Sequence, residues 1–487
     1  MARYAQVIVD VPAMQTNRPY TYELPQALQA QAQVGMRVIV PFGKGERQIQ
    51  GFIVGLTDEY GLTIAPKQVT SLMDLAPVLN NEALQLADWL AQETFSFKIR
   101  CLQVMLPNAM RASYSKSLRL LSADELPQEL NSLFAGKSEI EFDENKLSAQ
   151  QLNKLAQMRQ AGHLEVVYHV KDRAKAKLVG VVTSLVDEKN YAQFKAKVRK
   201  NAHKQLELLE FLYQNSHQKF LQTKLQASLQ ISLSQLKKAA QQGWLKLAKQ
   251  ERYRDPYGDK TLQATTPKQL TAEQQRAVEQ IDQAITAKNA TTFLLEGVTG
   301  SGKTEVYLQA IAHALSQGHS ALMLVPEISL TPQMVQRVKE RFGKEVAMLH
   351  SALSDGERYD EWRRIERKEA KVVVGARSAI FAPLDDLGLI IIDEEHETTY
   401  KQSERPMYHA AEAAKLRADF HNCPVVLGSA TPSLESYARS SKEVYTRFEL
   451  THRPGMQPLP KAEIVNMSDE HKEGNSGILS RKLEAAI

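Results

Sequence analysis

A glycine-rich loop at residues 297–304, which reads G-x-x-x-x-G-K-T, is the feature that most constrains the fold of this chain. An apolar run predicted as a strand, residues 291–295, precedes the loop, and a predicted helix opens after Lys303. Glycines let the backbone turn tightly and aim its N–H groups at phosphate oxygens, beside the positive end of the helix dipole. With both flanks in place, the loop predicts a nucleotide site on a parallel α/β sheet.

The loop also predicts ATP and Mg²⁺ as cofactors. Lys303 would supply a positive charge for the β- and γ-phosphates, and Thr304 would offer its hydroxyl to Mg²⁺. The other loop positions are expected to bind phosphate through their backbone N–H groups. The predicted nucleotide-binding residues of the loop are Gly297, Thr299, Gly300, Ser301, Gly302, Lys303 and Thr304.

An acidic pair, Asp393 and Glu394, ends a second apolar run at residues 389–392. The carboxyl ends of parallel strands meet at the sheet edge where ligands bind, so both carboxylates are expected beside the loop. Asp393 would hold Mg²⁺ together with Thr304, and Glu394 would act as general base on the attacking water. An acidic pair alone is equally typical of a helix N-cap, but downstream of a P-loop it favours an NTPase. The predicted catalytic residues are Lys303, Asp393 and Glu394.

The chain is predicted to be multidomain, because 487 residues are too many for one hydrophobic core. Residues 1–110 alternate short β-branched or aromatic runs with turn residues, which indicates a β-rich domain, and an amphipathic helix is expected over residues 81–93. Residues 266–450 alternate nearly continuous apolar strands with amphipathic helices. This pattern indicates an α/β P-loop lobe whose parallel sheet is covered on both faces.

Between these two parts, residues 111–265 are predicted to be helical and lysine-rich. Three helices and a strand-like tail outline a winged helix, an α+β relative of helix-turn-helix DNA-binding units. The same outline is typical of protein-interaction modules, and the basic band at residues 171–204 is equally typical of a solvated charged face. The expected helices cover residues 203–213 and 222–229, with a third that begins after Ser232 or Ser234 and ends at Gly243.

Composition limits the class of protein and its cellular compartment. A hydrophobic content of 43% is ordinary for a globular protein, and a net charge of +5 permits a polyanionic partner without requiring one. Cys101 and Cys423 lie far apart, so neither a disulfide framework nor a zinc site is expected, and a reducing cytosol fits. No signal peptide and no membrane-spanning run is expected, which predicts a cytoplasmic protein with no membrane partner. If its polyanionic partner is DNA, the protein is expected to be nucleoid-associated.

Several segments around the loop resemble the motor of superfamily 2 nucleic-acid helicases, which has a RecA-like lobe. The tetrad at residues 393–396 resembles the D-E-x-H motif, and residues 429–431 resemble the S-A-T segment. That segment couples nucleotide state to DNA grip, so the resemblance implies coupling roles for His396, Ser429 and Thr431. Gln274 stands where such helicases read adenine with a glutamine amide, although a helix-surface position is an alternative. Arg377 and Ser378 resemble the segment that touches the DNA backbone.

Read together, the motor segments resemble the PriA family of primosomal replication-restart DNA helicases (primosomal protein N′). The resemblance covers most of the chain, and its N-terminal part is similar to the 3′-DNA-binding domain of that family. The segments that carry it are residues 20–22, 34–38, 41–44, 324–333, 349–351, 375–383 (GARSAIFAP), 393–396, 400–402, 408–410 and 427–432.

The resemblance implies an ATP-dependent 3′→5′ DNA helicase that recognises stalled or abandoned replication forks and initiates replication restart. It implies as partners forked DNA with a nascent 3′ end, single-stranded DNA, single-strand DNA-binding protein and primosome proteins. In the loop at residues 397–410, Tyr400 and Tyr408 would stack on bases beside Lys401, although ordinary packing is an alternative for both rings. The implied pocket for the 3′ end comprises Tyr20, Thr21, Gly43, Lys44 and Lys67.

Some positions depart from the family pattern. Thr21 stands where the family often has aspartate, and Met407 and Ala411 replace arginines, which puts DNA recognition at these places in doubt. Residues 451–487 are expected to begin a second motor lobe, and zinc is expected only in the missing C-terminal part. Because an arginine of the second lobe stabilises charge on the γ-phosphate, the chain alone is expected to bind ATP and DNA but to hydrolyse ATP poorly. The alternatives are a fork-DNA-binding adaptor without motor activity and another superfamily 2 fork translocase.

Overall fold

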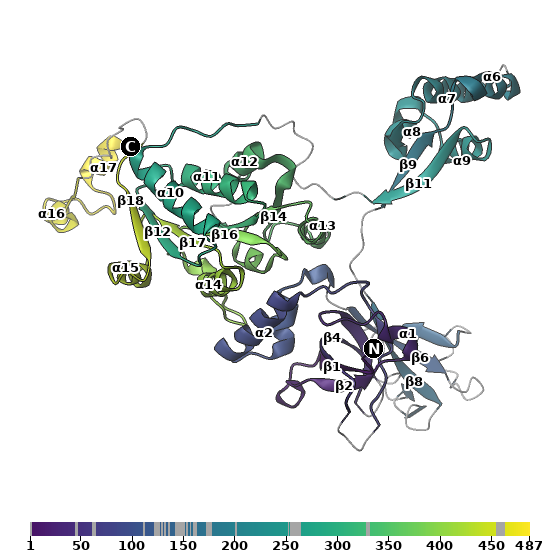
Figure 1. Ribbon diagram of the computed structural model, residues 1–487, viewed down its shortest axis with the longest axis horizontal. Coiled ribbons are helices and arrows are strands. Elements are labelled where there is room, and N and C mark those ends of the chain that lie inside the picture. The colour runs from purple at the N-terminus through teal and green to yellow at the C-terminus, as the bar shows by residue number, and fades with distance from the viewer. Residues whose placement is uncertain are drawn as a thin grey trace.

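Three parts of the chain are recognisable in the computed structural model (Figure 1). A β-rich N-terminal part lies against an α/β lobe, while the unit that contains α6–α9 stands apart from both. Among the residues that the structure describes, no helix has the length and apolar character needed to cross a membrane. The described residues are 2–43, 47–60, 65–110, 113–120, 163–171, 178–199, 202–251, 264–327, 332–453 and 463–487, with position 253 and scattered positions between 127 and 158.

The N-terminal part contains an antiparallel sheet in the strand order β2-β1-β4-β3-β5. Its inward side chains are fully buried, among them Val7, Val38 and Ile53. The strands predicted here from β-branched runs are confirmed, and so is the helix over residues 81–93. The elements are β1 (Tyr4–Val9), β2 (Tyr20–Glu23), α1 (Gln26–Gln29), β3 (Arg37–Phe42), β4 (Arg47–Thr57), β5 (Ser71–Leu72), α2 (Asn81–Glu93) and α3 (Lys98–Val104).

The helical prediction for the start of the middle region is wrong for residues 113–120, 139–141 and 164–171, which form strands. Strands β6 (Ser113–Leu120), β7 (Glu139–Glu141) and β8 (Leu164–Lys171) form a separate antiparallel sheet in the order β7-β6-β8. The lysine content suggested helix, but the β6 and β8 sequences alternate polar and apolar residues with the period of a strand. Part of the basic band, at residues 172–177, lies outside the described residues.

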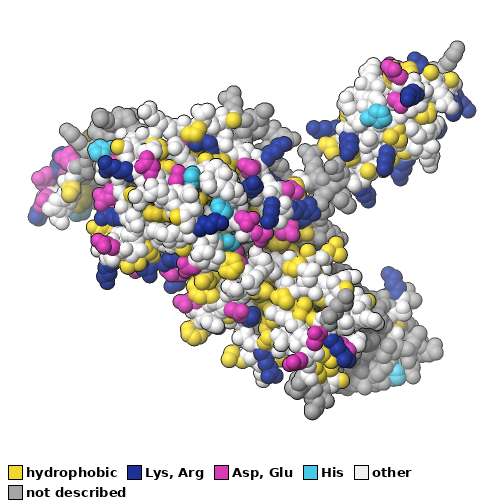
Figure 2. Space-filling view, in the orientation of Figure 1, with side chains coloured by type: hydrophobic (Ala, Val, Ile, Leu, Met, Phe, Trp, Pro, Cys, Tyr) yellow, Lys and Arg dark blue, Asp and Glu magenta, His cyan; other side chains and the backbone are white. Residues whose placement is uncertain are grey.

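A winged-helix-like unit follows, and the expected three helices and terminal strand are confirmed. Strand β9 and helix α6 were not predicted; β9 is the middle strand of an antiparallel sheet in the order β10-β9-β11. Ser232 caps the third helix by accepting a hydrogen bond from the backbone N–H of Gln235. Figure 2 shows lysine and arginine side chains over the visible face of this unit. The elements are β9 (Leu178–Ser184), α6 (Glu188–Lys197), α7 (His203–Gln214), β10 (Lys219–Leu221), α8 (Gln222–Leu229), α9 (Leu233–Gln241) and β11 (Leu245–Glu251).

The α/β lobe contains a parallel sheet in the strand order β14-β15-β13-β16-β17-β12-β18, as the alternating pattern predicts. Both faces are covered: α10, α11 and α12 pack on one, and α13 and α14 pack on the other. Alternate residues of the central strand enter the two cores, with Ile391 on one side and Ile390 and Ile392 on the other. Helix α15 and edge strand β18 were not predicted.

The elements of the lobe are α10 (Ala272–Thr286), β12 (Thr292–Gly297), α11 (Lys303–Ser316), β13 (Ser320–Leu324), α12 (Pro332–Phe342), β14 (Val346–Leu349), α13 (Asp355–Glu366), β15 (Val372–Gly375), β16 (Leu387–Asp393), α14 (Ala410–His421), β17 (Val425–Ser429), α15 (Leu434–Ser441) and β18 (Thr446–Leu450). Beyond it lie the short helices α16 (Met467–Lys472) and α17 (Arg481–Ala486).

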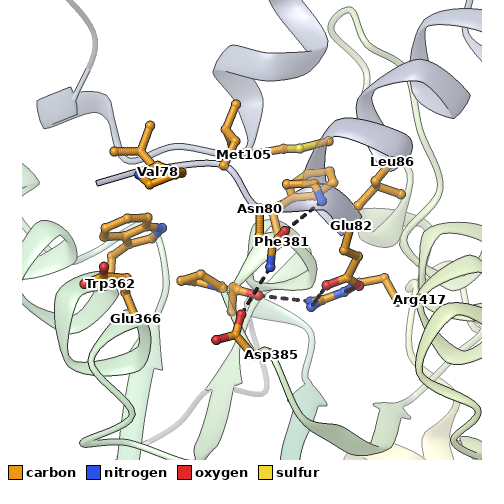
Figure 3. Close-up of a pocket in the computed structure, with 15 residues that line it drawn as sticks. Val78, Asn80, Glu82, Leu86, Met105, Trp362, Glu366, Phe381, Asp385 and Arg417 are labelled. Carbon is orange, nitrogen blue, oxygen red and sulfur yellow. Dashed lines mark hydrogen bonds and ion pairs between the residues drawn. The ribbon is translucent and has the colours of Figure 1, made fainter. Parts of the chain in front are cut away.

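A buried ion pair joins helix α2 to the α/β lobe (Figure 3). Arg417 donates from Nε to Oε1 of Glu82 at 2.5 Å and from its second guanidinium nitrogen to Oε2 at 3.0 Å. The same guanidinium donates to the carbonyl oxygens of Ile380 and Ala382. Hydrophobic residues of α2, α3, α13 and α14 form one continuous cluster around the pair. The ion pair lines an interdomain cavity of about 220 Å³.

We expect the pair to make stability depend on pH in the acid range. Burial alone would raise the pKa of Glu82, but the charge of Arg417 and hydrogen bonds from His421 and Arg417 outweigh burial and lower it to about 2. A carboxylate whose pKa is lowered by folding contributes stability above its ordinary pKa of 4.5, and that contribution is lost as the pH falls toward 2. From about pH 5 to 2, the wild type should lose about 3 kcal/mol more unfolding free energy than Glu82→Gln does. Urea unfolding across this range measures the difference, and identical slopes for the two proteins would contradict it.

Candidate active site and nucleic-acid interface

The glycine-rich loop joins β12 to α11, as predicted. Gly300 and Gly302 have φ of +84° and +86°, in the left-handed region that glycine adopts without strain. A Cβ on Gly297 would lie 2.5 Å from Oγ of Ser301, so the backbone turn leaves no room for a side chain there. The loop thus requires its glycines for geometric reasons.

The loop and the acidic pair meet at one cavity of about 660 Å³. Lys303 is buried, its Nζ donates to the carbonyl oxygen of Gly297 at 2.8 Å, and it lies 3.9 Å from Oε1 of Glu394. The predicted convergence of Lys303 with the carboxylates is therefore observed. The predicted residues that line the cavity are Gln274, Thr299, Gly300, Ser301, Gly302, Lys303, Thr304, Asp393 and Glu394.

Two tyrosines hold Asp393, the residue expected to bind Mg²⁺. The hydroxyl of Tyr307 donates to Oδ1 of Asp393 at 2.9 Å, and that of Tyr400 donates to its backbone oxygen at 2.6 Å. Burial raises the pKa of Asp393, although the Tyr307 hydrogen bond and the Lys303 charge oppose the rise. A carboxylate and the Thr304 hydroxyl on one cavity are the hard oxygen ligands that Mg²⁺ prefers, so the residues fit this metal. Sequence reasoning missed Tyr307, which gave no signal beyond being four residues after Lys303.

The predicted coupling residues form a chain of contacts from Glu394. Nδ1 of His396 lies 3.6 Å from Oε2 of Glu394 and 2.7 Å from Oγ of Ser429. That hydroxyl accepts a hydrogen bond from the backbone N–H of Thr431 at 3.0 Å. Glu394 has a φ of +46°, which is uncommon for a residue with a side chain and recurs at functional sites.

Glu395, the third residue of the tetrad, has a partner that sequence reasoning missed. It is buried and accepts hydrogen bonds from the backbone N–H of Ser433 at 2.6 Å and from the hydroxyls of Ser433 and Ser436 at 3.1 and 2.9 Å. These serines begin α15, directly after the S-A-T segment. The tetrad is therefore bonded both to the S-A-T segment, through His396, and to the start of α15, through Glu395.

Gln274 lies under the loop. Its Nε2 donates to the carbonyl oxygen of Ser301 at 2.7 Å, and its Oε1 accepts from the backbone N–H of Thr271 at 2.9 Å. The side chain is buried, so the helix-surface alternative is wrong. Both polar atoms of the amide already have protein partners, and adenine contact by Gln274 stays a prediction.

Arg377 anchors the loop that follows the tetrad. It donates to the carbonyl oxygens of Thr399 and Lys401 at 3.0 and 2.9 Å. Tyr400 and Tyr408 are 1% and 2% exposed, and the ring of Tyr408 packs edge-on against Phe381. In this conformation neither ring can stack on a base, which corrects that expectation in favour of the packing alternative. Ser378 and Lys401 are exposed and accessible to a ligand.

Three of the residues predicted to bind the 3′ end gather at one end of the N-terminal sheet. The ring of Tyr20 packs edge-on against Phe42 at 5.3 Å, and Nζ of Lys67 donates to the carbonyl oxygen of Gly43 at 2.8 Å. Gly43 has a φ of +76°, and no heavy atom lies within 4 Å of the point that a Cβ would occupy, so the backbone there is open. Thr21 lies beside Tyr20 on β2, and Lys44 lies outside the described residues.

Comparison with known proteins finds matches to two parts of the chain and to relatives along nearly its whole length. A family model described as a DEAD/DEAH box helicase matches residues 271–440, and one described as the PriA 3′DNA-binding domain matches residues 6–107. The replication restart protein PriA of Bacillus subtilis (strain 168) is 45% identical over 491 residues, which cover 99% of this chain and 60% of that protein. Its counterpart from Synechocystis is 33% identical over 512 residues, covering 99% and 59%.

The chain thus spans about 60% of the length of the curated relatives that it matches. Among solved structures, RecG bound to a three-way DNA junction is 25% identical with a TM-score of 0.31, covering 40% of this chain and 25% of that one. The matches to both domains and to relatives along nearly the whole chain show that it belongs to the PriA family of replication restart proteins.

Proposed function

We propose that this protein is an ATP-dependent 3′→5′ DNA helicase that recognises stalled or abandoned replication forks and initiates replication restart. The observation that carries the proposal is the meeting of Lys303 and Glu394, 3.9 Å apart, at a cavity that the P-loop lines. The names of the relatives supply the link to replication restart. Because the chain spans about 60% of their length, their activity and partners extend to it only as part of this proposal.

The proposed chemistry assigns one task to each residue of the cavity. Backbone N–H groups of the loop would bind the phosphates, and Lys303 would exchange its bond to Gly297 for one to the γ-phosphate. Asp393 and Thr304 would hold Mg²⁺, which supplies charge neutralisation at the phosphate oxygens when bound. Glu394 would orient and deprotonate the attacking water. The hydrogen bond from Tyr307 would keep Asp393 in place.

The same contacts support a route from the nucleotide to DNA. Occupation of the cavity would change the surroundings of Glu394, whose neighbour His396 is bonded to Ser429 of the S-A-T segment. On the DNA side, Ser378 and Lys401 are exposed for phosphate contact. Contact by Arg377, Tyr400 or Tyr408 would require the loop to open first, since all three are engaged within the protein.

The DNA partner proposed is a fork with a nascent 3′ end, bound by the pocket of Tyr20, Thr21, Gly43, Lys44 and Lys67, together with single-stranded DNA. Single-strand DNA-binding protein and primosome proteins are proposed as partners by family resemblance. The match of residues 6–107 to the PriA 3′DNA-binding domain supports this assignment.

Lys303→Ala tests the proposal. Its affinity for Mg·ATP should fall by at least roughly tenfold, since a hydrogen bond to a charged group is worth about 1.5–3 kcal/mol. Whatever DNA-stimulated hydrolysis the chain alone retains should be lost. Affinity for a fork with a free 3′ end should be unchanged and should exceed that for a fork with a 3′-phosphate. Lys344→Ala, an exposed lysine of the same lobe, is the control. Unaltered ATP affinity in Lys303→Ala would refute the nucleotide site. Equal affinity for the two forks would favour another fork translocase.

A further inference from the structure

Residues 265–269, here called the strap, form part of the wall of the nucleotide cavity. Thr265, Thr266, Lys268 and Gln269 line the cavity, and the strap precedes α10 without forming a helix or strand. Its side chains are exposed, so hydrophobic packing does not fix its position. Its backbone must be held by other contacts.

An ion pair between two helices supplies these contacts. Arg341, near the end of α12, lies 3.2 Å from Oε1 of Glu305, in the first turn of α11, and their side chains are only 7% and 12% exposed. Arg341 donates to the carbonyl oxygen of Thr266 at 3.2 Å. Glu305 accepts the backbone N–H of Lys268 at 3.0 Å. Each member of the pair therefore bonds both its partner and the strap.

Neighbouring residues reinforce the attachment. Nε2 of Gln309 donates to the carbonyl oxygen of Lys268 at 2.8 Å, and the carbonyl oxygen of Glu340 accepts the backbone N–H of Thr265 at 3.0 Å. Charge-assisted hydrogen bonds are stronger than neutral ones, so the Arg341–Glu305 pair is the main restraint. Without it, ordering the strap would cost conformational entropy at each residue.

The lining of the cavity leaves the strap as a wall for the nucleoside once the phosphates are bound by the P-loop. A triphosphate held by the P-loop fills the end that Lys303, Asp393 and Glu394 line. The remaining walls are the strap, Leu308 and the residues of α12. Gln274 lies beneath the loop with both polar atoms of its amide already bonded to protein.

We propose that Glu305 and Arg341 are positioning residues that hold the strap as the wall of the nucleoside end of this cavity. The inference rests on the proposed nucleotide site and adds the residues that shape its base-and-ribose end. Arg341 acts through the strap backbone, because its guanidinium is engaged with Glu305 and Thr266. The pair therefore affects affinity for a nucleoside without affecting affinity for phosphate alone.

Comparison of Mg·ATP with Mg·tripolyphosphate, which lacks a nucleoside, tests the inference by calorimetry on the whole chain. Arg341→Met should weaken ATP binding roughly tenfold and change tripolyphosphate binding by less than about twofold. Arg276→Met, which removes an exposed arginine from α10 outside the cavity, should change neither. If Arg341→Met does not fold, Glu305→Gln serves instead: it removes the charge while keeping an acceptor, and should give a smaller loss for ATP alone.

The outcomes separate the inference from the proposed function. Equal losses for ATP and tripolyphosphate would show that the pair merely supports the lobe or the P-loop, and would overturn the inference. Unchanged ATP affinity in a folded Arg341→Met variant would overturn it as well. Lys303→Ala, measured alongside, should weaken both ligands. If it weakens neither, the proposed nucleotide site itself fails, whatever Arg341→Met does.

Discussion

Arg417→Ala is expected to destabilise the protein by about 3–5 kcal/mol, because it leaves the Glu82 carboxylate buried without its counter-charge. Both side chains are at most 7% exposed, so the remaining carboxylate is poorly hydrated. The carbonyl oxygens of Ile380 and Ala382 lose donors at the same time. Urea unfolding of the wild type and the variant at pH 7 measures the loss.

Two further variants separate the buried charge from other effects of the substitution. Glu82→Gln combined with Arg417→Ala should recover part of the loss, since no uncompensated carboxylate remains. Arg3→Ala removes an exposed ion pair with Glu23 and should cost less than about 1 kcal/mol. A cost for Arg417→Ala as small as that for Arg3→Ala would show that the interdomain pair contributes little.

The Glu82–Arg417 pair lies between two regions that are proposed to bind DNA. The carbonyl oxygens that Arg417 binds belong to the segment that opens with Arg377 and Ser378. Arg377 in turn holds the loop whose Tyr400 bonds to Asp393. The pair therefore joins the domain proposed to bind the 3′ end to the segment proposed to contact the DNA backbone. Hydrogen bonds made by the side chains of Arg417, Arg377 and Tyr400 define this connection.

The sequence predicted those elements of the fold whose burial pattern is strong. Helices α2 and α8 have the predicted limits, because their patterns and flanking residues mark both ends. The strands of the parallel sheet are apolar throughout and were found for the same reason. Strand β18 was missed because it lies at the sheet edge with a single fully buried residue. Strands β6, β7 and β8 were missed because lysine content was given more weight than periodicity.

Among the functional residues, those in local motifs were predicted and those whose partners are distant in the sequence were missed. The P-loop and the acidic pair were found because their chemistry requires fixed residue types at fixed local spacing. The residues that support them were not: Tyr307 is 86 positions from Asp393, Glu395 is 38 from Ser433, and Arg341 is 36 from Glu305. Such pairs depend on how helices pack against the sheet. A single sequence carries no local pattern for them.

Gly428→Ala is expected to destabilise the protein by about 3 kcal/mol, near the upper end for an overpacked core. Gly428 lies on β17 directly beside Asp393, and a Cβ there would be 1.7 Å from the hydroxyl of Tyr307. Tyr307 is fully buried and cannot swing into solvent, so its ring must shift. That shift breaks the hydrogen bond to Asp393, and the Mg²⁺ concentration needed for half-maximal ATP binding should rise.

Tyr307→Phe distinguishes the clash from the lost hydrogen bond. Alone, it removes the donor to Asp393 without crowding and should cost about 1 kcal/mol. Combined with Gly428→Ala, it removes the closest contact, so the double variant should be more stable than Gly428→Ala alone. Both variants that contain Tyr307→Phe should still require more Mg²⁺ than the wild type, because neither restores the donor. A double variant less stable than Gly428→Ala would show that the Tyr307 hydroxyl is not what excludes a side chain at position 428.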